Sequence, residues 1–262
     1  MGVSESLIFP IYKKGSTTDP ANYRGISFLN ASYQIFTTVL QHRLNVWIRN
    51  NNLIGECQAG FRSGYSTVDH IFVLRSIAES FMNKGAKLYA LFVDFKSAFD
   101  SLFAFFIEDL VECLPCGIEY AGKAIKALML ADDIVILAYS PESLQLMINR
   151  LCDFGKIWNL TVNLEKSKVM IFRKGAGRNR NSQKWWYNGE TIEVVNEYRY
   201  LGILMTKNLN MENHFKDKLA KAKTAIAATW NRCFSNKNIR HSAKFRVFEA
   251  VSEAIMLYSA QL

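Results

Sequence analysis

The sequence has no hydrophobic run long enough to span a bilayer, and its first residues lack the basic and apolar regions of a secretory signal peptide. It also has only five cysteines, an odd number without regular spacing, which does not suit the disulfide scaffold of a small secreted domain. Repeats and low-complexity segments are absent as well. These absences predict an intracellular protein of the nucleus or cytoplasm that is neither secreted nor membrane-bound.

The pair Cys113 and Cys116 has the spacing of half a zinc site. No second cysteine or histidine pair follows at a useful distance, because His70 and His214 each stand alone. We therefore interpret the two residues as ordinary thiols rather than as metal ligands.

What the chain does contain is a balanced, moderately basic composition. It has 262 residues, 50% of them hydrophobic, which is enough to build the core of one domain or of a two-part domain. Its 32 basic and 23 acidic residues give a formal net charge of +9. This charge favours a polyanionic partner such as nucleic acid, although many basic globular proteins have no such partner.

Hydrophobic patterns predict alternating strands and helices. An unbroken apolar run at 88–93 is typical of a strand buried on both faces, and two apolar runs flank a tight turn at 131–133, as in a hairpin. We expect further strands at 7–12, 168–172 and 198–203, and helices over 36–48, from Thr67 as N-cap to 82, over 141–158 and over 215–230. The order predicts an α+β fold in which an antiparallel sheet carries its helices on one face and offers the other face to a ligand.

Three carboxylates stand at the ends of predicted strands: Asp94 after the first buried run, and Asp132 and Asp133 in the hairpin turn. Like charges held close together repel strongly unless a cation lies between them. Mg²⁺ prefers such oxygen ligands, and a pair of these ions can hold the attacking and leaving oxygens of a phosphoryl transfer. The pattern favours metal-assisted phosphoryl or nucleotidyl transfer, although turns also favour aspartate for purely conformational reasons.

An ordered set of short motifs accompanies these carboxylates. Together they resemble the finger and palm motifs of the reverse transcriptases of non-LTR (LINE-like) retrotransposons. The motifs are Lys13-Lys14-Gly15, Asn22-Tyr23-Arg24-Gly25-Ile26-Ser27, Gln58-Ala59-Gly60-Phe61-Arg62, Ser66-Thr67-Val68-Asp69-His70, Val93-Asp94-Phe95-Lys96-Ser97-Ala98-Phe99-Asp100, Ala131-Asp132-Asp133, Val162-Asn163-Leu164-Glu165-Lys166-Ser167-Lys168 and Tyr200-Leu201-Gly202.

The resemblance implies a right-hand polymerase. Residues 1–87 would form a fingers-like region, 88–205 a palm with an antiparallel sheet, and 206–262 the start of a helical thumb. The implied activity is RNA-directed DNA polymerisation, in which a DNA primer is extended on an RNA template from deoxynucleoside triphosphates. The implied cofactor is Mg²⁺, with Mn²⁺ as an alternative.

The resemblance also implies a role for particular residues. Asp94, Asp132 and Asp133 would be catalytic and would hold the metal ions, together with the carbonyl of Phe95. The side chain of Phe99 would select deoxynucleotides by excluding a 2′-hydroxyl. Nucleotide phosphates would be bound by Arg24 with Lys13 or Lys14, nucleic acid by Arg62, Lys216 and Lys223, and the pyrophosphate would receive a proton from Lys166 or Lys168.

Two features of the sequence also have an ordinary structural explanation that involves no nucleic acid. The lysines of the last predicted helix are also compatible with an ordinary solvated face. The aromatic run Trp185-Trp186-Tyr187 could stack on bases, but we expect these rings to anchor the neighbouring basic loop to the core.

The sequence departs from the family pattern in two places. Leu130 stands where the family has tyrosine before Ala-Asp-Asp, and only 38 residues separate Asp94 from Asp132, where the family has a much longer segment. We place the junction of this internal deletion near Ser101 and Leu102. Because positioning supplies much of the catalysis in such reactions, we expect a weakened or inactive polymerase. The alternatives are a non-catalytic nucleic-acid-binding remnant and a fragment without a selected role.

Overall fold

The computed structural model describes residues 7–13, 15–51, 53–60, 62, 64–95, 108–175, 183–258 and 260. The chain forms two compact units, Met1–Gly55 and Glu56–Leu262. In the first unit, strands β1 (Leu7–Tyr12) and β2 (Tyr23–Phe28) form an antiparallel hairpin around the short helix η1 (Pro20–Asn22). Helix α1 (Ala31–Asn50) follows, capped by the Asn30 side chain, which accepts a hydrogen bond from the Tyr33 amide. The predicted strand at 7–12 and the helix over 36–48 are confirmed.

This first unit has almost no core of its own. Helix α1 has no buried residue, and large apolar side chains such as Phe36 and Trp47 remain more than half exposed. The β1 strand is exposed along its whole length. The first unit therefore presents apolar surface on both its helix and its hairpin.

The second unit is built on a five-stranded sheet with the order β11-β8-β3-β7-β6. Its central strand β3 pairs antiparallel with β7 and with β8, and β7 pairs antiparallel with β6. The edge strand β11 pairs parallel with β8, so the sheet is mixed rather than wholly antiparallel as predicted. The strands are β3 (Leu88–Val93), β6 (Ala127–Leu130), β7 (Asp133–Ala138), β8 (Lys168–Phe172) and β11 (Val194–Val195).

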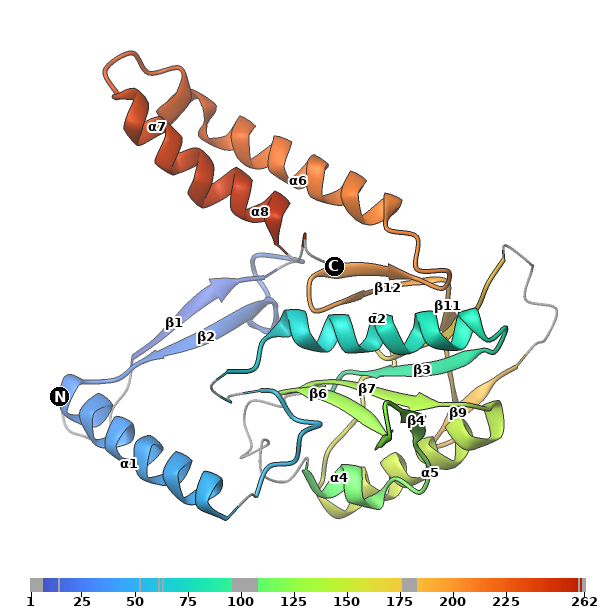
Figure 1. Cartoon of the computed structure of the whole chain (residues 1–262). Helices are drawn as coiled ribbons and strands as arrows, with labels where there is room; N and C mark the ends of the chain where they lie inside the picture. The colour runs from blue at the N-terminus through green and yellow to red at the C-terminus, as the bar shows by residue number, and fades with distance from the viewer. Residues whose placement is uncertain are drawn as a thin grey trace. The chain divides into compact units, whose positions relative to one another are not determined.

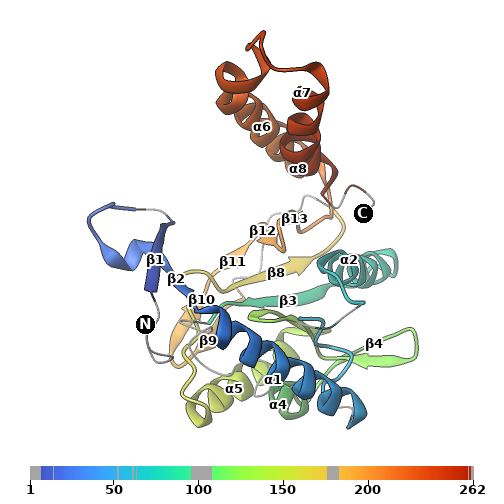
Figure 2. The ribbon, with the colours of Figure 1, turned by 90° about the vertical axis from the view of Figure 1, so that its left-hand side faces the viewer.

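Helices cover both faces of this sheet (Figure 1). Alternate residues of β3 enter two separate cores: Leu91 packs with helix α5 (Pro141–Ile157) and α4 (Glu108–Cys113), whereas Phe92 packs with α2 (Thr67–Asn83). Figure 2 shows α4 and α5 on the side of the sheet away from the hairpin β12 (Glu197–Tyr200) and β13 (Ile203–Thr206). The prediction that one face stays open was wrong, because β3 is apolar on both sides and needs a cover on each.

The remaining elements of the second unit are hairpins and a helical end. Residues 198–203, predicted as one strand, instead turn at Leu201 and Gly202 between β12 and β13. Both turn residues have positive φ, 46° and 82°, which breaks the strand. The other elements are β4 (Ile118–Tyr120), β5 (Lys123–Ile125), β9 (Trp185–Tyr187), β10 (Glu190–Ile192), α6 (Glu212–Thr229), η3 (Trp230–Phe234), α7 (His241–Phe248), η4 (Glu249–Glu253) and α8 (Ala254–Leu257).

Local corrections concern helix starts and aromatic side chains. The N-cap of α2 is Ser66 rather than Thr67, and Phe72 on the same helix is exposed although its neighbour Ile71 is buried. Trp185 and Tyr187 are buried, as an anchoring role requires, and the indole of Trp185 donates to the carbonyl of Pro141 on α5.

Helix α2 belongs to the same compact unit as the sheet, although we predicted it within the fingers. The boundaries of the fingers, palm and thumb remain predictions. Over the described residues, no helix is long and apolar enough to cross a membrane.

The capping box at the start of α2 gives a test of this local structure. The Ser66 side chain accepts from the Asp69 amide, and the Asp69 carboxylate accepts from the Ser66 amide. Ser66→Ala should lower the free energy of unfolding by about 1 kcal/mol, because the Asp69 amide loses its acceptor and the Asp69 carboxylate loses the hydroxyl donor. Urea unfolding measures this change, with Ser80→Ala inside the same helix as control. An equal effect of both substitutions would contradict the capping role.

Candidate active site

Asp94 and Asp133 lie at the same end of neighbouring strands and face the same way. Strand β3 pairs with β7 up to Val93 and Ile134, so the next pair in this register is Asp94 opposite Asp133. Phe92 on β3 and Val135 on β7 enter the core on the α2 face, and side chains two residues apart point to the same side. Both carboxylates therefore point toward the α2 face of the sheet.

Asp132 occupies the tip of the β6–β7 hairpin. Leu130 pairs with Asp133, which leaves Ala131 and Asp132 as a two-residue loop. Ala131 has φ of 57°, the left-handed conformation that such tight hairpin turns require. The turn thus brings a third carboxylate, that of Asp132, close to Asp94 and Asp133.

The pKa of Asp133 indicates that the three carboxylates lie close enough to interact. The pKa of Asp133 is raised to about 6 by the loss of surrounding water and by the charges of Asp132 and Asp94. The side chain of Asp133 is solvent-exposed by surface area, so water screens part of this effect. The site is short of positive charge, and a bound cation would relieve the repulsion.

A positively charged side chain, that of Lys166, already lies beside one of the three carboxylates. The ammonium of Lys166 lies 3.1 Å from a carboxylate oxygen of Asp94. The backbone around Asp94 is fixed by the same segment, because the amide of Asn163 donates to its carbonyl at 2.7 Å and its own amide donates to the Ser167 hydroxyl at 3.0 Å. Lys168, the other candidate for proton transfer, instead pairs with Glu193 at 2.7 Å.

Two tyrosines of β12 border the site, and sequence reasoning did not assign them a place there. Tyr198 stacks on Phe92 with ring centroids 4.3 Å apart. Burial and the charges of Asp133 and Asp94 raise the pKa of Tyr198 to about 12. Tyr200 is buried, and burial followed by the charge of Asp133 raises its pKa further. The β12–β13 hairpin places both tyrosines near the carboxylates, and the sequence pattern did not predict this hairpin.

Gln58 belongs to the motif Gln58-Ala59-Gly60-Phe61-Arg62, but the sequence did not predict its contact with the hairpin turn. Its side chain is fully buried, and its carbonyl oxygen accepts a hydrogen bond from the amide of Ala131 in the turn that carries Asp132. The Gln-Ala-Gly sequence by itself does not predict this contact, because Ala131 lies 73 positions away in the chain.

The other predicted site residues are only partly placed. The side chain of Phe95 is buried in the core on the α5 face, opposite to the carboxylates. Lys13 and Arg24 are exposed at the β1–β2 hairpin of the first unit. Lys14 and Phe99 lie outside the described residues, as do Ser101 and Leu102 at the predicted junction.

The residues predicted to bind nucleic acid differ in their surroundings. The guanidinium of Arg62 lies over the Tyr65 ring at 4.2 Å and donates to the backbone carbonyl of Gln58. Lys216 pairs with Glu212 one helical turn away, and Lys223 is exposed on α6.

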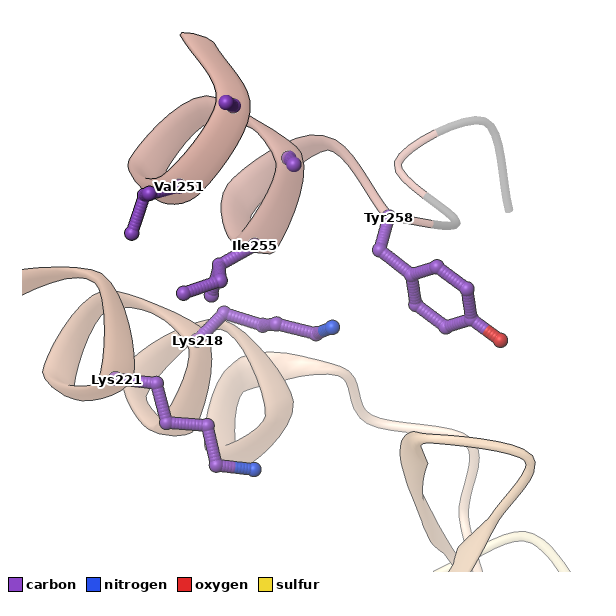
Figure 3. Close-up of a pocket in the computed structure, with 7 residues that line it drawn as sticks. Lys218, Lys221, Val251, Ile255 and Tyr258 are labelled. Atoms are coloured by element: carbon purple, nitrogen blue, oxygen red, sulfur yellow. The ribbon is translucent and has the colours of Figure 1, made fainter. Parts of the chain in front are cut away.

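A groove of about 500 Å³ lies between α6 and the last helical segment. Lys218 and Lys221 line it from α6, facing Val251, Ile255 and Tyr258 (Figure 3). The ammonium of Lys218 lies 4.5 Å from the centre of the Tyr258 ring, and the Tyr258 hydroxyl donates to the carbonyl of Leu201. These contacts fasten the end of the helical segment to the β12–β13 turn.

The carboxylate oxygens of this site suit a hard cation such as Mg²⁺, but the protein side chains alone would supply only some of its ligands. In the part of the chain that the structure describes, no group of three or more His, Cys, Asp and Glu side chains could hold a metal ion as they stand. Mg²⁺ commonly needs only one or two carboxylates, with water and substrate phosphates as its other ligands. The carboxylates therefore fit Mg²⁺ in chemistry and charge, but do not form a closed protein site.

Comparisons with known proteins show what the chain is similar to. A family model described as reverse transcriptase (RNA-dependent DNA polymerase) matches residues 11–104. A probable RNA-directed DNA polymerase from transposon X-element of Drosophila melanogaster is 20% identical over 98% of this chain. Residues 11–104 are thus similar to reverse transcriptases, and almost the whole chain is similar to an RNA-directed DNA polymerase of a Drosophila transposon.

Further proteins similar to this chain carry related names. A probable RNA-directed DNA polymerase from transposon BS of Drosophila melanogaster is 32% identical over 36% of the chain and 11% of its own length. The RNA-directed DNA polymerase from mobile element jockey of Drosophila funebris is 22% identical over 50% of the chain and 15% of its own length. The chain spans about a third of the X-element protein, 35% of its length.

Two features of these matches bear on the predicted deletion. The family match ends at residue 104, close to the junction predicted near Ser101 and Leu102. The X-element alignment runs over 319 positions although the chain has 262 residues, so that relative has residues without a counterpart here. Both features agree with an internally shortened domain.

The raised pKa of Asp133 predicts a pH-dependent stability. Between about pH 4 and pH 6 the folded chain binds more protons at this carboxyl than the unfolded chain does, so the free energy of unfolding falls as pH rises through this window. The full shift corresponds to about 3 kcal/mol, and solvent screening reduces it to about 1 kcal/mol.

In metal-free buffer, Asp133→Asn should therefore be more stable than the parent by about 1 kcal/mol at neutral pH, and should lose this advantage at about pH 4. Urea unfolding at the two pH values measures the difference. Asp153→Asn, at an exposed position of α5, is the control. An advantage of Asp133→Asn that does not change with pH would contradict the assignment.

Proposed function

We propose that this domain is an RNA-directed DNA polymerase that extends a DNA primer on an RNA template from deoxynucleoside triphosphates. The observation that carries the proposal is the convergence of Asp94, Asp132 and Asp133 at one end of the sheet, where desolvation and the charges of Asp132 and Asp94 raise the pKa of Asp133. Together with the family match, this cluster supports nucleotidyl transfer over binding alone.

Asp94 and Asp132 would hold the metal ions, with Asp133 beside them and the Phe95 carbonyl as a further ligand. Bound Mg²⁺, for which Mn²⁺ is an alternative, would activate the primer hydroxyl and neutralise charge on the phosphates. Lys166 lies at Asp94 whereas Lys168 is engaged by Glu193, so we assign proton donation to the pyrophosphate to Lys166.

The remaining roles follow the family resemblance. Arg24 with Lys13 or Lys14 would bind the triphosphate, and Phe99 would exclude ribonucleotides by contact with a 2′-hydroxyl. Arg62, Lys216 and Lys223 would contact the nucleic-acid backbone, so their contribution to binding should weaken as salt rises. The shortened segment between Asp94 and Asp132 would lower the rate by leaving the template poorly positioned.

Primer extension on an RNA template with Mg²⁺ tests the function. The parent should extend the primer, and the double variant Asp132→Ala, Asp133→Ala should lose activity about a thousandfold, because the charge that binds the metal is gone. The double variant Asp153→Ala, Glu190→Ala removes the same charge from exposed positions and should retain parental activity.

No extension by a folded parent would contradict the polymerase function. Binding of RNA that weakens steeply with salt would then identify a non-catalytic nucleic-acid-binding remnant. The absence of both activities would leave a fragment of the element without either function.

A further inference from the structure

The segment around Gln58 lies against the edge of the sheet beside the hairpin that carries Asp132. The amide of Ala59 donates to the carbonyl of Met129 at 2.8 Å, and the amide of Met129 donates to the carbonyl of Cys57 at 2.8 Å. This parallel bridge extends the sheet by a short piece beyond β6. It leads the chain directly to the β6–β7 turn.

At the β6–β7 turn, the side chain of Gln58, rather than a backbone carbonyl, accepts hydrogen bonds from two backbone amides. Its Oε1 accepts from the amide of Gly60 at 2.7 Å and from the amide of Ala131 at 3.1 Å. The side chain has no exposed surface. A buried amide left without an acceptor costs about 1–3 kcal/mol, so both bonds matter to the turn.

The turn needs such support because its first residue is strained. Ala131 has a side chain and yet adopts φ of 57°. The left-handed conformation costs a non-glycine residue about 1–2 kcal/mol and persists where the surroundings fix it. The bond from Ala131 to Gln58 is one of the contacts that fix it.

Gly60 allows the close approach that this arrangement requires. A Cβ atom at position 60 would lie 2.3 Å from the amide nitrogen of Ala131, a backbone atom that cannot move aside cheaply. The Gln-Ala-Gly sequence thus combines an acceptor for the turn with the space for the turn to sit against it.

A glutamine at position 58 costs free energy, because part of its amide group is buried without a hydrogen bond, and this cost indicates which property of the side chain the turn needs. Both neighbours of Oε1 are donors, which fixes the orientation of the amide group, and Nε2 is then buried without a hydrogen-bond partner in the described structure. An apolar side chain of similar volume would fill the space without this unpaired donor. The acceptor, rather than packing volume, is therefore the property that the site uses.

We infer that Gln58 is a positioning residue, which holds Ala131 in its left-handed conformation and thereby orients the carboxylate of Asp132, the next residue of the turn. The inference rests on the proposed function in so far as Asp132 is a metal ligand. The hydrogen bonds themselves do not depend on that function.

The test compares two glutamine-to-methionine substitutions. Gln58→Met keeps the approximate volume and removes the acceptor. Gln145→Met is the matched control, because Oε1 of Gln145 accepts from the amide of Trp186 at 3.0 Å, on β9 and away from the aspartates. Two quantities are measured for each folded chain: amide hydrogen exchange in the segment 127–136, and Mn²⁺ affinity by electron paramagnetic resonance.

Gln58→Met should speed exchange in the turn segment about tenfold and weaken Mn²⁺ binding about tenfold, since the ligand is no longer held in one orientation. Gln145→Met should instead speed exchange in 185–187 and leave Mn²⁺ affinity unchanged. Gly60→Ala, which keeps Gln58 but displaces it from the turn, should act in the same direction as Gln58→Met.

Unchanged exchange and Mn²⁺ affinity in Gln58→Met would overturn the inference, as would equal effects of Gln145→Met on the turn. An effect of Gln58→Met that Gly60→Ala does not share would also count against it. Should the parent chain not bind Mn²⁺, the proposed metal-dependent function fails, whereas the exchange measurements still decide whether Gln58 holds the turn.

Discussion

The proposed active site depends on one constraint, the repulsion among three carboxylates held together at the end of a buried strand. Asp94 follows β3, Asp133 begins the neighbouring strand opposite it, and Asp132 occupies the adjoining turn. Like charges directly opposite on paired strands destabilise a sheet. Lys166 offsets part of the charge at Asp94, and the pKa of Asp133 stays raised. A protein keeps such an arrangement at the expense of stability, which is typical of a site that a cation or a charged substrate completes.

The rigid part of the molecule is what holds these charges together. Strand β3 is buried along its whole length, and its alternate side chains join the cores on the two faces of the sheet. Displacement of Asp94 would require movement of a strand that is packed on both sides, which dense protein interiors resist. The hairpin tip is different, because a two-residue loop has no such packing. The Gln58 contact and the space left by Gly60 supply the missing restraint at Ala131.

The sequence predicted those features that depend on local pattern. The apolar run of β3, the acidic β6–β7 hairpin and the Ser140 cap of α5 are each encoded within a few neighbouring residues. The sequence did not predict three other features: the helices on both faces of the sheet, the position of Tyr198 near the carboxylates, and the hydrogen bond between Gln58 and Ala131. Each of these joins residues far apart in the chain, as Gln58 and Ala131 are separated by 73 positions. Periodicity carries no information on such pairings.

The shortened connection between Asp94 and Asp132 affects the two parts of the proposed catalysis differently. Strands β3 and β7 pair in continuous register from Tyr89 and Ala138 to Val93 and Ile134, so the short connection is compatible with carboxylates placed side by side. By the family resemblance, a longer segment would supply contacts to the template and the incoming base. A defect in activity would therefore lie in the alignment of nucleic acid over the site rather than in metal binding. Mn²⁺ affinity and primer extension separate these two steps, because the first needs only the carboxylates whereas the second also needs an aligned primer and template.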